Sequence, residues 1–129
     1  MIYSLKNDGD RNITNHFKIK EFRCKDGSDQ IMIEEELCVK LEELRNKLNK
    51  PVQVLSGYRT KEYNKKVNGA EKSYHLTGSA ADIKVKDTDV KLIAIVAAKV
   101  GFSGIGVYDT FVHVDVRKDD YYWIGGKNG

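Results

Sequence analysis

The sequence has little of several features that mark whole classes of protein. It contains one proline in 129 residues and is 40% apolar, which does not fit a disordered or low-complexity chain. Its longest apolar stretch, Leu92 to Val100, includes a lysine and falls short of the ~20 residues that span a bilayer, so we expect no membrane insertion. The two cysteines, Cys24 and Cys38, form neither a CxxC pair nor a disulfide framework.

The sequence also lacks a strong charge of either sign. There are 22 Lys and Arg against 19 Asp and Glu, a net charge of +3, and the lysines are scattered from Lys6 to Lys127. A nucleic-acid-binding protein would carry a clustered basic stripe, so we expect no nucleic-acid partner. The length suits one domain over residues 1–129, which we expect to be monomeric.

Two long amphipathic segments predict the main helices. Leucines at 37, 41, 44 and 48 form one apolar stripe over Glu34–Leu48, and Pro51 follows it. A second stripe runs through Thr88–Val100, with Gly101 at its end. A short helix is expected at Lys61–Val67.

Alternating patterns predict the strands. Residues 52–56 and 79–85 are expected strands, and 104–108 with 111–116 form an expected hairpin around Asp109 and Thr110. Residues 1–15 are expected to be an arm or a first short strand, residues 16–22 an extended piece docked on the core, and 118–129 a largely polar tail. The prediction is an α+β fold, with a small antiparallel sheet packed against two main helices.

Two of the three histidines have carboxylates close to them in the expected sheet. Alternation places His113 and Asp115 on one strand face, with Val112, Val114 and Val116 on the other. Asp82 projects opposite the apolar side of its own strand, and His75 stands at that strand's entry. Two imidazoles and a carboxylate are a common set of zinc ligands. Half-exposed sheet residues without a metal are the other interpretation.

Five segments closely resemble the zinc D-Ala-D-Ala carboxypeptidase family, which includes peptidoglycan endopeptidases and phage endolysin domains. They are Ser73–Ile83 (SYHLTGSAADI), Gly104–Tyr108 with Phe111–Asp115 (GIGVY and FVHVD), Leu55–Thr60 (LSGYRT) and Phe17–Cys24 (FKIKEFRC). The His-x6-Asp element followed by FVHVD is the specific part. The resemblance covers roughly residues 14 to 123.

The resemblance implies roles for individual residues. Zinc would be held by His75, Asp82 and His113, and Arg59 would grip a carboxylate of the substrate peptide, for which a guanidinium is suited. A surface ion pair is the alternative role of Arg59.

The general base of the family has no counterpart at its usual place. Many relatives carry a histidine two residues, or an acid three residues, before the last zinc ligand, where this sequence has Phe111 and Thr110. Strand alternation favours Asp115 as the base, and Asp109 is the alternative. Asp115 also suits a different role, orienting a zinc-bound imidazole.

The implied function is zinc-dependent hydrolysis of amide bonds in bacterial peptidoglycan stem peptides. The alternatives are a zinc-stabilised module that binds these peptides without cutting them, and a structural component without metal. Whether the bond cut is the D-Ala-D-Ala terminus, the cross-link or the L-Ala–D-Glu bond stays open. The first residues, MIYSLKNDGDRN, lack the apolar core of a secretory signal. We therefore expect synthesis in the cytoplasm without an export signal, unless a signal has been lost. A phage-encoded protein that acts on the cell wall would have such a sequence, and so would a plain cytosolic protein.

Overall fold

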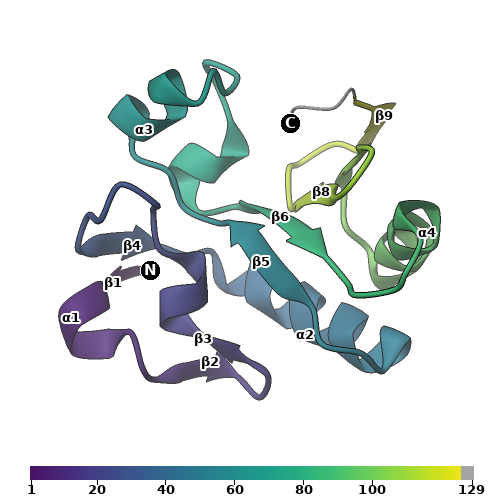
Figure 1. Cartoon of the computed structure of the whole chain (residues 1–129), viewed down its shortest axis with the longest axis horizontal. Coiled ribbons are helices and arrows are strands. Elements are labelled where there is room, and N and C mark those ends of the chain that lie inside the picture. The colour runs from purple at the N-terminus through teal and green to yellow at the C-terminus, as the bar shows by residue number, and fades with distance from the viewer. Residues whose placement is uncertain (126–129) are drawn as a thin grey trace.

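The computed structural model describes residues 1–125 and has an α+β fold (Figure 1). The helices are α1 Leu5–Asp8, α2 Glu35–Leu48, α3 Lys61–Lys66 and α4 Val90–Val100, with 3-10 helices η1 Ile19–Phe22 and η2 Tyr74–Thr77. The strands are β1 Ile2–Ser4, β2 Asn12–Thr14, β3 Phe17–Lys18, β4 Gln30–Met32, β5 Gln53–Ser56, β6 Ala80–Lys84, β7 Gly104–Val107, β8 Val112–Asp115 and β9 Tyr121–Ile124. None of the helices in this part of the chain is long and apolar enough to cross a membrane.

The main sheet has the strand order β5-β6-β8-β7-β9. Its first four strands are antiparallel neighbours, and the expected hairpin of β7 and β8 is confirmed. The sheet is mixed rather than wholly antiparallel, because β9 pairs with β7 in parallel. This strand lies in the segment expected to be a polar tail, of which residues 126–129 lie outside the described residues.

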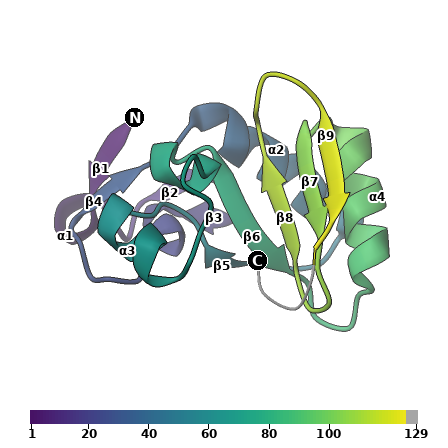
Figure 2. The same cartoon turned by 90° about the horizontal axis from the view of Figure 1, so that it is seen from above.

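One face of this sheet forms the hydrophobic core. Helix α4 lies beside β7 (Figure 2) and also contacts β8 and α2. The side chains buried between these elements include Ala81, Ile83, Val112 and Val114 of the sheet, Leu41 and Leu44 of α2, and Ile93 and Ala97 of α4. The alternation predicted for β6 and β8 is therefore confirmed, and the opposite face of these strands carries the polar residues.

Both long helices form where the apolar stripes predicted them, with later starts. Helix α2 begins after Glu34, whose backbone is extended, and α4 begins after Asp89, whose side chain accepts a hydrogen bond from the Lys91 amide. Each helix is followed by a residue in the left-handed conformation, Asn49 (φ 53°) or Gly101 (φ 98°), which ends the helix and turns the chain into the next loop.

The first 32 residues form small structures around the core. Strand β1 pairs with β4, and β2 pairs with β3. The expected docking of residues 16–22 is confirmed, since Phe17, Ile19 and Phe22 are each 1% exposed. The segment is not extended throughout, because η1 replaces the extended backbone from Ile19 onward. Both cysteines are buried and free.

Candidate metal centre

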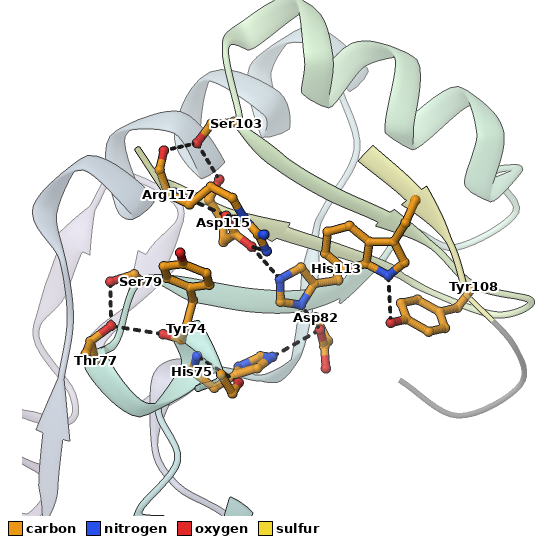
Figure 3. Close-up of polar contacts among 12 residues, drawn as sticks. Tyr74, His75, Thr77, Ser79, Asp82, Ser103, Tyr108, His113, Asp115 and Arg117 are labelled. Carbon is orange, nitrogen blue, oxygen red and sulfur yellow. Dashed lines mark hydrogen bonds and ion pairs between the residues drawn. The ribbon is translucent and has the colours of Figure 1, made fainter. Parts of the chain in front are cut away.

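The three predicted ligands meet at one point on the polar face of the sheet (Figure 3). Asp82 of β6 pairs in register with His113 of β8, and His75 reaches them from η2. Asp82 Oδ1 lies 3.2 Å from His75 Nε2 and 2.9 Å from His113 Nδ1. All three side chains are buried, and one ligand atom from each lies within 4.8 Å of the others.

The outer nitrogen of each imidazole is bound by an oxygen. His75 Nδ1 lies 2.7 Å from the Gly57 carbonyl, which only accepts hydrogen bonds, so Nδ1 carries the proton and Nε2 faces the cluster with a lone pair. His113 Nε2 lies 2.8 Å from the Asp115 carboxylate, which leaves His113 Nδ1 facing the cluster. When both imidazoles are neutral, two nitrogen lone pairs and a carboxylate oxygen converge, and this donor set fits a zinc ion.

The pKa shifts describe how the cluster balances its charge. Burial would raise the pKa of Asp82, but the hydrogen bonds and the charge of His113 and His75, when these imidazoles are protonated on their inner nitrogens, hold it well below its usual range. Burial would lower the pKa of His113, and its hydrogen bonds to Asp115 and Asp82 outweigh this and raise it. A proton on His113 and a metal ion therefore compete for the same inner nitrogen.

Asp115 lies behind His113 and is fully buried. Its Oδ1 accepts from Arg117 Nε at 2.8 Å, and its Oδ2 accepts from Arg117 Nη2 at 2.6 Å and from His113 Nε2. Burial would raise the pKa of this carboxyl, but the hydrogen bonds from Arg117 and His113 lower it well below its usual range. This arrangement favours the role of orienting His113 over that of a general base. Asp109, the alternative base, is exposed in the hairpin turn.

Two glycines of β7 make room for this arrangement. Gly104 pairs in register with Asp115, and a Cβ there would lie 1.9 Å from Asp115 Oδ1. Gly106 pairs with His113, and a Cβ there would lie 2.4 Å from the ring of Trp123. The absence of both side chains lets the carboxylate be buried and lets the indole of Trp123 approach the His113 ring, at 5.2 Å between centroids.

Arg59 is part of the cluster rather than a surface residue. Its side chain is 10% exposed, and Nη2 lies 3.3 Å from Asp82 Oδ2. Its other nitrogens donate to Ser56 Oγ at 3.1 Å and to Asn64 Oδ1 at 3.2 Å. A surface ion pair is therefore wrong as a description of Arg59, and this arginine holds the Asp82 oxygen that faces away from the imidazoles.

The cluster opens into a cleft of about 230 Å³. It is lined by Arg59, Gly69, Ala70, Lys72, Ser73, Tyr74, His75, Asp82, Tyr108, His113, Arg117 and Trp123.

Two residues of this lining, Arg117 and Trp123, were not predicted from the sequence. Alternation from His113 through Asp115 points to Arg117 on the same face, but Trp123 lies on a strand that was not predicted. Three candidate ligands beside an open cleft would leave a position for water or substrate, as in a hydrolytic rather than a structural metal centre.

Comparison with known families agrees with this class. A family model described as Peptidase M15 matches residues 14–115, which is most of the chain. The chain therefore belongs to the peptidase M15 family, a family of zinc peptidases. This confirms the resemblance identified from the HLTGSAAD and FVHVD segments.

The chain is also similar to curated proteins named peptidoglycan L,D-endopeptidase MepK. Those of Escherichia coli strain K12 and of Shigella flexneri are each 36% identical to it over 73 residues. The matched region is 51% of this chain and 40% of each relative. The chain therefore spans less than half the length of these relatives.

Proposed function

We propose that this chain is a zinc-dependent peptidase that hydrolyses amide bonds in bacterial peptidoglycan stem peptides. The observation that carries the proposal is the convergence of His75 Nε2, Asp82 Oδ1 and His113 Nδ1 beside an open cleft. Membership of the peptidase M15 family and the similarity to peptidoglycan L,D-endopeptidases support it. The names of these relatives favour an endopeptidase over a carboxypeptidase.

The residues around the cluster have separate tasks in this proposal. His75, Asp82 and His113 hold the metal, which when bound would acidify a water molecule and polarise the scissile carbonyl. Arg59 fixes the rotamer of Asp82 through the 3.3 Å contact to Oδ2, and its grip on a substrate carboxylate, which the family resemblance implies, stays a prediction. Asp115 keeps the proton of His113 on Nε2, so that Nδ1 stays available as a ligand.

One observation favours a second candidate, a zinc-stabilised module that binds the peptides without cutting them. Among the described residues, Asp82 is the single carboxylate that lines the cleft, and the peptidase proposal uses it as a ligand. A separate carboxylate that would accept a proton from water is thus missing from the lining. Turnover decides between the two candidates.

The test is digestion of purified peptidoglycan by the zinc-loaded chain, with mass spectrometry of the released fragments. We expect one zinc per chain, and fragments whose masses identify the bond cut. His113→Ala should lose both the metal and the fragments while keeping its circular dichroism spectrum. His16→Ala is the matched control, because His16 lies at the surface and pairs with Glu42.

Two outcomes would contradict the proposal. If the protein binds zinc but releases no fragment, it is the zinc-stabilised binding module and not a peptidase. If His113→Ala releases fragments as fast as the parent protein, the metal centre takes no part in the reaction. Action on the cell wall after cytoplasmic synthesis, as for a phage endolysin, and a monomeric state stay predictions that localisation and sedimentation experiments would test.

A further inference from the structure

Arg117 lies at the wall of the cleft in a fixed orientation. Its Nε and Nη2 donate to the two oxygens of Asp115, at 2.8 and 2.6 Å, and its backbone amide donates to the same carboxylate at 3.1 Å. A guanidinium bound at two points to a buried carboxylate cannot rotate out of its plane without breaking both hydrogen bonds. Arg117 therefore enters the cleft as a preorganised group rather than as a mobile surface side chain.

Aromatic rings surround the same guanidinium. Arg117 Cζ lies 4.6 Å from the ring centroid of Tyr74, 5.2 Å from that of Trp123 and 5.4 Å from that of Tyr121. These distances are within the range of cation–π contacts, which hold the cation and exclude water from its faces. Tyr74 and Trp123 also line the cleft, so that the guanidinium and two of its rings form one wall.

Arg117 has donors left for a ligand. Nε and Nη2 bind Asp115, but Nη1 makes no hydrogen bond with any of residues 1–125. Arg59, the other arginine of the cleft, already donates from all three of its nitrogens, to Ser56, Asn64 and Asp82. Arg117 is therefore the arginine with an unoccupied terminal nitrogen at this wall.

The wall borders the metal cluster on two sides. Tyr74 precedes the ligand His75 in η2, and Asp115 joins Arg117 to the ligand His113 (Figure 3). A group bound at Arg117 would thus sit next to the scissile bond of a peptide held at the cluster. A guanidinium with free N–H donors recognises carboxylates and phosphates, and of these two a peptide supplies the carboxylate.

We propose that Arg117 and Tyr74 form a subsite for a free carboxylate on the substrate peptide, beside the bond that is cut. The proposal deepens the proposed function and rests on it for the identity of the substrate. The subsite would make the enzyme prefer peptides that carry this carboxylate over the same peptides with a carboxamide, which has the same shape but no charge. Arg117 is then a binding residue as well as the partner of Asp115.

The experiment compares two synthetic stem peptides that differ only in a carboxylate or a carboxamide next to the scissile bond. Binding to the zinc-loaded protein is measured by calorimetry, and kcat/KM by chromatography of the products. We expect the parent protein to prefer the carboxylate peptide by about 10- to 100-fold, the range of a charge-assisted hydrogen bond. Arg117→Gln should lose this preference, because it should weaken binding and lower kcat/KM for the carboxylate peptide alone. Lys118→Gln is the matched control, because it removes the same charge from the exposed neighbouring residue.

Each result separates one interpretation from another. Equal weakening of both peptides by Arg117→Gln, or no preference in the parent, would overturn the subsite and leave Arg117 as a positioning residue for Asp115. Preferential binding of the carboxylate peptide without turnover would sustain the subsite and defeat the proposed peptidase. Zinc content, measured in every variant, shows that the comparison is made on loaded protein.

Discussion

Two carboxylates bind opposite nitrogens of one imidazole, and they have different consequences for His113. Asp82 Oδ1 lies 2.9 Å from Nδ1, and Asp115 Oδ2 lies 2.8 Å from Nε2. Arg117 neutralises Asp115 from behind, so Asp115 stays a pure acceptor and keeps the proton on Nε2. The orientation and tautomer of this imidazole thus depend on a residue that does not line the cleft.

Replacing Asp115 by Asn tests this dependence at a single residue. The amide has an oxygen and an NH2 group, and the NH2 group facing Nε2 would favour the tautomer with the proton on Nδ1, which no longer binds a metal. We expect zinc affinity to fall about 10- to 100-fold, measured by titration against a competing chelator. If affinity is unchanged while turnover falls about 10²- to 10⁴-fold, Asp115 is the general base that strand alternation first indicated. Asp109→Asn is the control, since this exposed residue should alter neither quantity.

Residue types and strand alternation placed Asp82 and His113 on one polar face with His75 at its entry, because strand period acts locally, and the family resemblance then implied that the three are zinc ligands. The structure brings these three side chains together. The contacts of Arg59 with Asp82, and of Arg117 with three aromatic rings, depend on how separate segments meet. Composition gives no measure of such distances. The prediction of Asp115 as the general base has the same limit. Strand periodicity gives the face on which Asp115 lies, but it does not show that Arg117 donates hydrogen bonds to both of its oxygens.

At the scale of elements, strand β7 shows why a central strand contains two glycines. Gly104 and Gly106 lie opposite Asp115 and His113, so their missing side chains leave space on the polar face of the sheet. Ile105 points to the other side and joins the core. Strand β7 therefore has glycines on its polar face because side chains of the neighbouring strands β8 and β9, Asp115 and Trp123, occupy that space.

Gly104→Ala should destabilise the fold through the clash of its Cβ with Asp115. The Cβ would lie 1.9 Å from Asp115 Oδ1, and overpacking of this kind costs about 1–3 kcal/mol of unfolding free energy. Denaturant unfolding of the metal-free protein measures it. In the background of Asp115→Ala the same glycine substitution should cost much less, because the carboxylate is gone. Equal cost in both backgrounds would place the strain elsewhere in β7.

The elements that were predicted are those whose signal lies within one segment. The leucine stripe predicts α2, and the alternation of residues 111–116 predicts β8. Strand β9 escaped because Tyr121–Ile124 is a run of four apolar residues without alternation, and its partner β7 is separated from it by β8 along the chain. The parallel pairing could not be inferred from either segment alone.

At the scale of the whole molecule, the candidate metal centre connects parts that the hydrophobic core holds less directly. The core is built from the sheet, helices α2 and α4 and the N-terminal segment, while η2, which carries His75, contributes no residue to it. A bound ion would tie η2 to β6 and β8 through one ligand from each. Metal binding should therefore contribute to the stability of the whole fold and not only to chemistry.

Removal of zinc should accordingly lower the melting temperature. A ligand at about 100 times its dissociation constant stabilises by about 2.7 kcal/mol, which for a chain of this size corresponds to roughly 10 °C. Differential scanning fluorimetry with a chelator, and then with zinc restored, measures the change. His113→Ala should melt at the same temperature with and without zinc. If the melting temperature of the parent protein also does not change with zinc, the cluster is not a metal centre.

The stabilisation by zinc should also shrink as the pH falls. Burial lowers the pKa of His113, but the hydrogen bonds to Asp115 and Asp82 raise it above its ordinary value overall. In the metal-free protein the charged imidazole therefore stabilises the fold fully below about pH 6.5, the unfolded value, and this contribution is lost as the pH rises through the higher folded pKa. Zinc needs the neutral imidazole, so its effect on the melting temperature should be largest near pH 8 and smallest near pH 5.5. A zinc effect that is constant over this range would mean that His113 does not exchange a proton for the metal.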